Sequence, residues 1–542
     1  MKTDKLSKIG DQWSLKLLLK FFAVSFLLYG VSIHAQNNVR ESWVKNYAEP
    51  DSSNEATAML VDSSGNVYVI GNHKISFSWP SFNVDFITIK YNTFGDEQWV
   101  ARYDGPGNGH DETADAIIDQ EGNVYVAGTS ASSGTYPYNY DFVTVKYRPN
   151  GVEEWIARSG GSNDEWASAL ELDRNGNIIV VGSSTGPDAL FVKYSHDGQE
   201  LSQILFDDRC GPNDIVVDDL GNIYIMSSYR VGKLDREGVL QWCKTFRAPS
   251  GITRSAAMAV DNHHDLYVTG WVEYAHWSSD FVTAKYDSNG TQKWMDIYPG
   301  SLGYSTTNYY ARAITIGDSG NIYIAGTGEN HYTTIKYEPT GRKHWIANYN
   351  EPPGIPAHGP TAITLDDNGD IYVTGGADDD ILTIKYNSFG EELWKVRFSS
   401  PLDDRPIAII VDKRRNVYVA GNSVRYTTRN ESIIRTIKYT QTPVTSIKNV
   451  TLAVPNDLWL AQNYPNPFNP TTNISYNLPQ AGNVHLAIYD ISGRQVELLV
   501  HSVQSAGRHS IKWNAENQPS GVYLYRLMTN NFIATKKLLL IK

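Results

Sequence analysis

The stretch Asp-Gln-Glu-Gly-Asn-Val-Tyr-Val-Ala-Gly, residues 119–128, recurs with the same chemistry eight times along the chain. In most copies Asp-x-x-Gly-Asn leads into an apolar-Tyr-apolar triplet. Asp and Asn cap a tight turn, Gly accepts a positive φ, and Val, Ile and Tyr favour an extended strand. Copies spaced 43 to 57 residues apart predict an array of repeated units. They begin at Asp62, Asp119, Asp173, Asp218, Asp261, Gly317, Asp366 and Asp412.

Each unit contains four short runs of strand-forming residues, which in the second unit are 113–118, 123–128, 141–147 and 154–158. The first run is apolar three residues and one residue before the turn, so one face of that strand is buried. The third run ends in Lys-Tyr in most units, and a tryptophan follows eight residues later in six of them, with Ser202 as the exception. We expect these rings to pack between neighbouring sheets and not to bind a ligand. They are Trp99, Trp155, Trp242, Trp294, Trp345 and Trp394.

The two ends of the array complement each other. The last unit stops at Lys438-Tyr439 without a tryptophan strand, whereas an isolated copy of that strand, residues 41–47 with Trp43, stands before the first unit. We infer that the N-terminal strand completes the last unit. Four strands per unit without helices then predict an all-β fold, an eight-bladed β-propeller closed by its N-terminal strand.

The repeat resembles the bacterial SBBP-type β-propeller repeat, whose pattern combines the turn Asp, Gly-Asn-[Val/Ile]-Tyr-Val-[Ala/Thr]-Gly, Asp-Phe-x-Thr-x-Lys-Tyr and Gly-x-x-x-Trp. The resemblance covers about residues 40–440 and implies a propeller without a particular reaction. Gly290-Thr-Gln-Lys-Trp294 is also similar to the tryptophan-docking motif of quinoprotein propellers. Those enzymes typically carry an adjacent cysteine pair, which this sequence lacks, so we attribute the similarity to shared blade packing.

Residues 1–35 have the pattern of a signal peptide. Lysines between positions 2 and 20 precede an apolar run at 21–33, which is too short to span a bilayer, and Ala35 offers a cleavage site. No other run reaches transmembrane length. A net charge of −12 with scattered basic residues argues against a nucleic-acid partner. The two cysteines, Cys210 and Cys243, either pair or remain separate buried thiols.

The composition of the sequence changes after the propeller, which we place at residues 36–440. Residues 441–459 are polar and contain two prolines, as in a linker, and residues 460–542 alternate as in a small Ig-like β-sandwich. Gln-Asn-Tyr-Pro-Asn-Pro-Phe-Asn-Pro-Thr-Thr at 462–472 and the motifs after it closely resemble the C-terminal sorting domain of type IX secretion cargo. The resemblance implies that the type IX machinery is a partner, that the protein is secreted or on the outer-membrane surface, and that the tail is removed during export.

Catalytic and metal-binding motifs are scarce. The sequence contains no Gly-x-Ser-x-Gly, phosphate loop, His-Glu-x-x-His or Cys-x-x-Cys. His263-His264-Asp265 stands where other copies have x-Gly-Asn, which favours a variant hairpin turn over a metal cluster. Asp-x-x-Gly-Asn lacks the alternating carboxylates and the bidentate Glu of a calcium loop. Asp378-Asp379-Asp380 reads as a solvated loop. We therefore predict no cofactor, no metal and no catalytic residue.

Two carboxylates interrupt a pattern of small residues. Asp115 and Asp214 stand four residues before the turn, where the other six units carry Ala. A carboxylate at such a position must be hydrogen-bonded, paired or directed into the central channel. Both residues are channel candidates, with sequence drift at a channel-lining position as the alternative.

The lengths of the loops indicate which face of the propeller binds a partner. The turns between first and second and between third and fourth strands are short, whereas the other connections vary and share the opposite face, where binding residues usually lie. These variable loops are rich in aromatic residues, including Trp79, Tyr138 and Trp277, whose alternative role is to pack the loops together. Seven residues before the turn, around the ring, stands a mixed set: Glu55, Glu112, Trp166, Arg254, Tyr310 and Arg405.

Two classes of function remain open. The first is a secreted or surface module that binds a glycan or a protein through the variable-loop face. The second is an extracellular enzyme, a lyase or hydrolase of polymers, with its site at the mouth of the channel. The absence of an acid/base pair at recognisable spacing favours the binding module.

Overall fold

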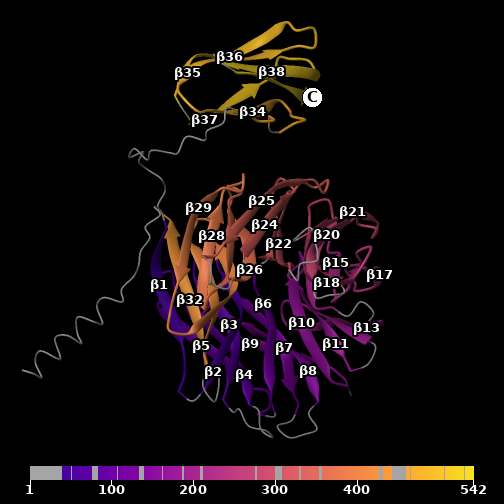
Figure 1. Cartoon of the computed structure of the whole chain (residues 1–542). Helices are drawn as coiled ribbons and strands as arrows, with labels where there is room; N and C mark the ends of the chain where they lie inside the picture. The colour runs from indigo at the N-terminus through magenta and orange to yellow at the C-terminus, as the bar shows by residue number, and fades with distance from the viewer. Residues whose placement is uncertain are drawn as a thin grey trace, which may run out of the picture. The chain divides into compact units, whose positions relative to one another are not determined.

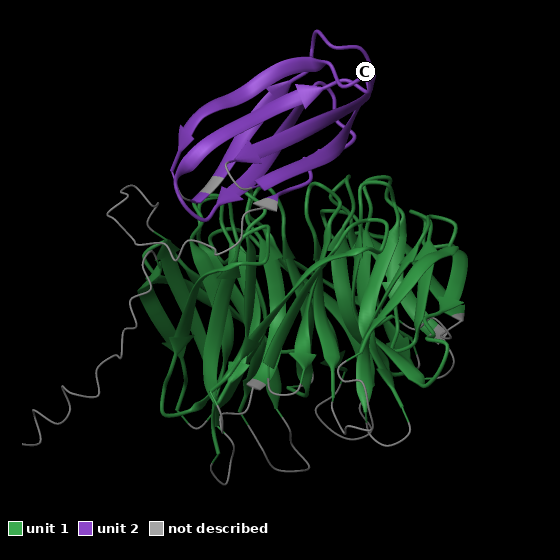
Figure 2. Ribbon diagram, turned by 45° about the horizontal axis from the view of Figure 1, so that its top comes forward, with its two compact units in different colours: residues 1–443 green, residues 444–542 purple. Residues whose placement is uncertain are grey.

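The computed structural model describes residues 39–50, 52–75, 83–106, 108–132, 139–161, 163–185, 188–207, 212–274, 278–299, 308–328, 331–352, 357–426, 431–441, 459–463, 465–505, 507–529 and 532–542. Within these residues the secondary structure is all strand, as expected, and no helix is long and apolar enough to cross a membrane. The chain divides into two compact units, 1–443 and 444–542 (Figure 2). The predicted signal peptide and most of the predicted linker lie outside the described residues.

The described part of the first unit contains eight four-stranded antiparallel sheets, which stand side by side in Figure 1. The first four sheets are β2–β5 (Ser53–Val61, Val67–Lys74, Val84–Tyr91, Glu97–Tyr103), β6–β9 (Asp111–Ile118, Val124–Ala131, Tyr140–Tyr147, Glu153–Ser159), β10–β13 (Glu165–Leu172, Ile178–Ser184, Asp188–Tyr194, Glu200–Asp207) and β14–β17 (Asp214–Val217, Ile223–Met226, Arg230–Leu234, Leu240–Thr245).

The next three sheets are β18–β21 (Ile252–Val260, Leu266–Glu273, Ser279–Tyr286, Gln292–Tyr298), β22–β25 (Tyr310–Ile316, Ile322–Gly328, His331–Tyr337, Lys343–Asn350) and β26–β29 (Ala357–Leu365, Ile371–Ala377, Asp380–Tyr386, Glu392–Phe398). The last sheet combines β30 (Asp403–Val411), β31 (Val417–Arg425) and β32 (Glu431–Gln441) with β1 (Val39–Tyr47), which comes from the other end of the unit.

The repeated Asp-x-x-Gly-Asn sequence forms the hairpin between the first and second strands of a sheet. Asp119 Oδ1 accepts a hydrogen bond from the backbone N–H of Asn123 at 2.8 Å, and its Oδ2 accepts one from the hydroxyl of Tyr125 at 3.0 Å. Gly122 has a φ of 84°. In the fifth unit His264 takes this position with a φ of 64°, so the predicted variant turn is confirmed.

The tryptophans connect each sheet to the next one. Trp294 on β21 donates from Nε1 to the carbonyl oxygen of Pro339 at 3.0 Å, and its ring covers Gly341 in the turn between β24 and β25. Lys336 on β24 makes the same kind of bond to the carbonyl of Ser388 in the following turn. The predicted packing between sheets is therefore confirmed. The other Nε1 donors to the next turn's carbonyl are Trp99 to Pro149, Trp155 to His196, Trp242 to Ser288 and Trp345 to Ser388.

The same contact joins the last sheet to the first. β1 pairs with β32 as predicted, with Glu41 opposite Tyr439 and Val44 opposite Ile437. Trp43 then donates to the carbonyl of Thr93, in the turn between β4 and β5, at 3.2 Å. Each first strand also contacts the first strand of the next sheet, and β30 contacts β2. The eight sheets therefore form a closed succession with the first strands innermost.

The second unit consists of two antiparallel sheets around one core. One contains β33 (Trp459–Leu460), β34 (Thr471–Leu478) and β37 (Gly507–Asn514), and the other contains β35 (Gly482–Tyr489), β36 (Gln495–Gln504), β38 (Gly521–Thr529) and β39 (Phe532–Leu540). Trp513 lies fully buried between them. The segment at 462–472 holds the last strand, because Asn466 Oδ1 accepts from the N–H of Leu539 at 2.8 Å and Gln462 donates to the carbonyl of Lys537 at 2.6 Å.

The contact between the tryptophan ring and the glycine turn of the next sheet can be tested by changing the glycine. Gly341 has a φ of 86°, and a Cβ there would lie 2.7 Å from the Trp294 ring. The change Gly341→Ala should therefore cost about 1–2 kcal/mol for the left-handed backbone and roughly 1–3 kcal/mol more for the displaced ring. Urea unfolding of the purified chain, followed by tryptophan fluorescence, measures this loss of unfolding free energy.

Gly176 provides the matched control. It has a φ of 74°, but a Cβ there would meet nothing within 4 Å. Gly176→Ala should consequently show the backbone cost alone. Equal losses for the two variants would contradict a stabilising role of the tryptophan contact.

Candidate functional site

The six mixed residues predicted around the ring occupy one register position. Each lies near the start of a first strand and pairs with the second strand of its own sheet, as Glu112 does with Thr129. The other pairs are Glu55 with Asn72, Trp166 with Ser183, Arg254 with Trp271, Tyr310 with Thr327, and Arg405 with Asn422. The sequence therefore identified equivalent positions. Their surroundings differ from sheet to sheet.

Two of these residues line one hollow between neighbouring sheets. Glu112 on β6 and Trp166 on β10 lie on the wall of a cavity of about 350 Å³, which also contains His110 and Tyr140. The rings of Tyr140 and Trp166 have centroids 6.4 Å apart, and the ring of His110 stands edge-on to Tyr140 at 6.2 Å. Trp166 keeps 39% of its surface exposed, so a ligand can reach it. We call this cavity the aromatic groove; its other lining residues are Thr113, Ala114, Thr129 and Ala167.

The polar side of the aromatic groove is an imidazole and a carboxylate. His110 Nε2 lies 3.3 Å from Glu112 Oε2. The hydrogen bond from His110 is the main cause that holds the pKa of Glu112 below its usual range, and the charge of Lys74 on the preceding sheet contributes. The groove thus combines two flat rings with a charged acceptor and a donor. Sequence reasoning missed His110, because its position is not marked by the repeat.

A second aromatic cluster lies on β18, β19 and β22. The rings of Trp271 and Tyr310 meet edge to face at 5.3 Å, and the guanidinium of Arg312 lies within 6 Å of both ring centroids. Trp271 donates to Glu273 at 2.9 Å, and Glu273 also accepts from Arg254 at 3.2 Å. Arg254 and Tyr310 are therefore tied into one packed group.

The remaining predicted binding residues stand apart from both clusters. Glu55 pairs with Lys74 at 2.6 Å, and Arg405 pairs with Asp403 at 2.7 Å. Trp79, Tyr138 and Trp277 lie outside the described residues. Their part in binding stays a prediction.

The channel candidates belong to a larger acidic group. Asp115 on β6 and Asp214 on β14 are half-buried, and Glu171 on β10 stands between them on the intervening first strand. Asp115 Oδ2 accepts from the N–H of Leu170 at 3.2 Å, which satisfies part of its charge. Burial raises the pKa of Asp115 to about 6. Burial, together with the charges of the other acids, raises the pKa of Glu171 and of Asp214 to about 7.

Glu171 was missed although the sequence contained a signal. It stands two residues before the turn, where the other units carry apolar residues or Thr. The effect of Asp115 and Asp214 on Glu171 becomes apparent only once the neighbouring sheets are packed. The three acids form a proton-binding group, and no role in binding or catalysis is assigned to them by this geometry.

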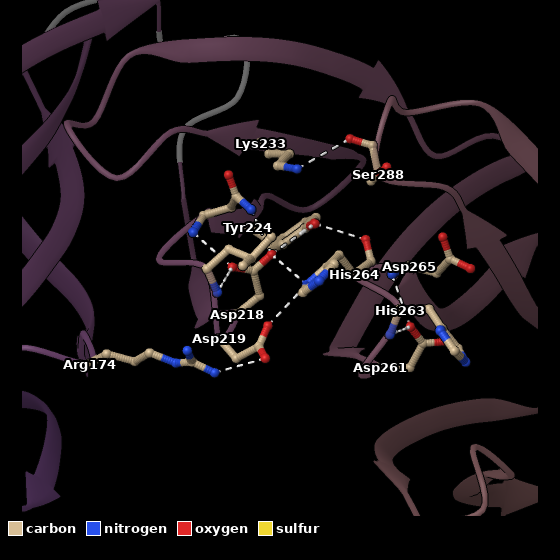
Figure 3. A network of polar contacts seen from close by, with 12 residues as sticks. Arg174, Asp218, Asp219, Tyr224, Lys233, Asp261, His263, His264, Asp265 and Ser288 are labelled. Atoms are coloured by element: carbon tan, nitrogen blue, oxygen red, sulfur yellow. Dashed lines mark hydrogen bonds and ion pairs between the residues drawn. The ribbon is translucent and has the colours of Figure 1, made fainter.

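The turn that carries His263, His264 and Asp265 reaches back to the preceding sheet (Figure 3). His264 Nδ1 lies 3.1 Å from Asp218 Oδ2 and 3.3 Å from Asp219 Oδ1. Oxygens of both acids and the imidazole nitrogen are close enough to share a metal ion. However, Asp218 already caps its own turn through Asn222, and Arg174 neutralises Asp219 at 2.8 Å. The network therefore acts as a sheet-to-sheet contact.

Cys243 on β17 is disulfide-bonded. Cys210, the other cysteine of the sequence, lies outside the described residues.

Comparison with known proteins identifies the second unit. Residues 462–542 match the family model of the secretion system C-terminal sorting domain. This unit is a secretion sorting domain. The sorting domain indicates export by type IX secretion to the cell surface or the extracellular space, and an interaction with the type IX machinery, as the sequence predicted. No curated protein matches the chain.

Several solved structures resemble the chain at low sequence identity. Polysaccharide lyase Uly1 is 11% identical, over 75% of this chain and 93% of that chain, with a TM-score of 0.39. A protein from Lactobacillus plantarum is 12% identical, over 72% and 99%, with a TM-score of 0.38. The Pan2 WD40 domain of Neurospora crassa is 10% identical, over 63% and 93%, with a TM-score of 0.36.

The acidic group predicts how stability changes with pH. Because the pKa values of Asp115, Glu171 and Asp214 are raised, the folded chain holds protons that the unfolded chain has released between about pH 4 and pH 7. The free energy of unfolding should therefore fall as pH rises through this window. The double change Glu171→Gln, Asp214→Asn should flatten this decline in urea unfolding at a series of pH values.

The exposed residue Glu121 offers the control for this series. Glu121→Gln should leave the pH dependence as in the parent protein, because its side chain lies on an exposed turn. If the free energy of unfolding of the double variant depends on pH as steeply as that of the parent protein, the three acids do not bind extra protons in the folded state.

Proposed function

We propose that the chain is an eight-bladed β-propeller of SBBP-type repeats that binds an extracellular glycan in the aromatic groove, as a secreted or surface-attached protein. The closed succession of eight sheets supports the propeller. β1 supplies the fourth strand of the last sheet and so joins the two ends of the ring, which suits a rigid recognition platform. The sorting domain, with an Ig-like sandwich, directs export, and the signal peptide at residues 1–35 delivers the chain to the periplasm beforehand.

The observation that carries the proposal is the composition of the aromatic groove. Trp166 and Tyr140 present flat apolar faces, and such faces pack well against the apolar face of a sugar ring. Glu112 and His110 beside them offer hydrogen-bond partners for hydroxyl groups. The groove lies where β6 and β10 begin and where β7 ends and β8 starts, on the face of the variable connections. Loops held by a rigid scaffold are the usual place for binding residues.

A second candidate function is cleavage of a polymer bound in the same groove. The pair of His110 and Glu112, 3.3 Å apart beside Tyr140, could exchange protons with a substrate. We rank this lyase or hydrolase second, because none of the described residues that line the groove is a further group positioned as a nucleophile or metal ligand. Incubation of the purified protein with each glycan that it binds, followed by mass spectrometry of products, distinguishes the two functions.

The binding proposal predicts the effect of removing one ring. Trp166→Ala should weaken binding of a glycan identified on an array by about ten-fold or more, because a central aromatic contributes roughly 2 kcal/mol or more. Isothermal titration with the purified chain measures the affinity. Circular dichroism and the unfolding midpoint should stay close to the parent values, since Trp166 is partly exposed.

An exposed aromatic residue on another turn serves as the control. Phe389 lies between β28 and β29 with 62% of its surface exposed. Phe389→Ala should bind the same glycan with the parent affinity. Unchanged binding by Trp166→Ala would remove the aromatic groove as the site.

A further inference from the structure

Three carboxylates converge where the first sheet meets the second. Asp85 is the second residue of β4, Asp111 begins β6, and Asp104 follows β5. One oxygen of each lies within 4.8 Å of one oxygen of the other two. We call these three residues the acidic junction. It is separate from the aromatic groove, although Asp111 is the direct neighbour of His110 and Glu112 in sequence.

Two of the three side chains are buried with an unpartnered oxygen. Asp85 keeps 5% of its surface exposed and Asp111 is fully buried, yet Oδ1 of each has no hydrogen-bond partner. Asp111 Oδ2 accepts a hydrogen bond from the N–H of Gly105 at 2.7 Å, and the side chain of Ser130 and the charge of Arg158 also act on this carboxylate. A buried ionised carboxylate without a partner is strongly unfavourable unless an opposite charge is supplied.

In two other sheets the acid at the equivalent position is paired with an arginine. Asp141 stands at the place of Asp85 in the next sheet and pairs with Arg158 at 3.4 Å. In the seventh sheet Asp380 occupies the same place and pairs with Arg397 at 3.2 Å. Both arginines stand three residues after the tryptophan of their sheet.

The first sheet also has this arginine, but its guanidinium pairs with an acid other than Asp85. Arg102, at the equivalent position, pairs with Glu49 and with the hydroxyl of Tyr47. Asp85 faces Asp104 and Asp111 instead. Burial, followed by the charges of these two acids, raises the pKa of Asp85 to about 7, although the charge of Arg102 opposes this shift.

We propose that the acidic junction is a binding site for a divalent cation, with Ca²⁺ as the preferred ion. Ca²⁺ takes carboxylate and amide oxygens at 2.3–2.6 Å, so its ligand oxygens lie within about 5 Å of one another. The three carboxylates meet this spacing. The side-chain amide nitrogen of Asn108 donates to Asp104 Oδ2 at 2.6 Å and so orients this carboxylate. An all-oxygen set without thiolate or imidazole favours Ca²⁺ over zinc or copper.

The position of the junction gives the ion a structural task. It joins β4 of the first sheet to the start of β6 in the second, where the backbone N–H of Val84 already meets the carbonyl of Gly109 at 3.4 Å. A bound ion stabilises the folded state by mass action, because the unfolded chain does not hold the three acids together. The same segment carries His110 and Glu112 into the aromatic groove.

The test uses the full chain, freed of metal with EDTA and then given millimolar Ca²⁺ or Mg²⁺. Ca²⁺ should raise the melting temperature by several degrees, and Mg²⁺ should raise it less. Isothermal titration with Ca²⁺ should show a site that Asp85→Asn abolishes. Asp141→Asn, at the arginine-paired position, should keep the full Ca²⁺ effect.

The sign of the Asp85→Asn effect distinguishes a metal ligand from a merely structural residue. In EDTA the variant should melt no lower than the parent protein, because an unpaired buried charge is removed, whereas in Ca²⁺ it should melt lower. Asp104→Asn, at an exposed ligand, should weaken Ca²⁺ binding and provides the answer if Asp85→Asn does not fold. A melting temperature of the parent protein that Ca²⁺ does not change, or a Ca²⁺ effect that persists in both variants, would overturn the proposal.

Discussion

The contact on which the first unit depends is the docking of a tryptophan on the glycine turn of the next sheet. The indole covers the glycine, and its N–H reaches the carbonyl two residues earlier, as Trp345 does with Gly390 and Ser388. A lysine from the third strand of the same sheet donates to that carbonyl too. Any side chain on the glycine would enter the ring, so turn and tryptophan have to be provided together. Six of the eight sheets therefore carry both parts of this joint, the glycine turn and the tryptophan.

The joint explains how the chain tolerates variable loops. The described contacts between sheets are made largely by the short turns and the first strands, so the sheets do not require uniform connections on the other face. That face can differ from sheet to sheet, and it does: Glu112 and Trp166 line a groove, whereas Arg254 and Tyr310 belong to a packed cluster. Where the joint lacks its tryptophan, at Ser202, the next turn packs against Phe191 and Ile204 instead. The turn of the next sheet therefore still packs against an apolar surface, which is formed by other side chains in place of the tryptophan.

The sequence predicts what is repeated and local. Turn residues, buried strands, inter-sheet tryptophans and the pairing of β1 with β32 all follow from patterns within one unit or from counting strands. It does not predict what arises between units. Glu171 is informative only beside Asp115 and Asp214, and the groove requires Tyr140 and Trp166 from different sheets. The acidic junction arises because Arg102 pairs with Glu49 and not with Asp85. The spacing of these residues in the sequence does not reveal which of the two acids the arginine pairs with.

The most direct measurement compares the chain with a form that lacks residues 39–47, the strand β1. If the ring is closed by this strand, its removal exposes the edge of β32, deletes the Trp43 contact with Thr93, and lowers the free energy of unfolding by several kcal/mol. Urea unfolding followed by far-ultraviolet circular dichroism reports this directly. Unfolding curves that coincide for the two forms would contradict closure as the constraint that holds the sheets together.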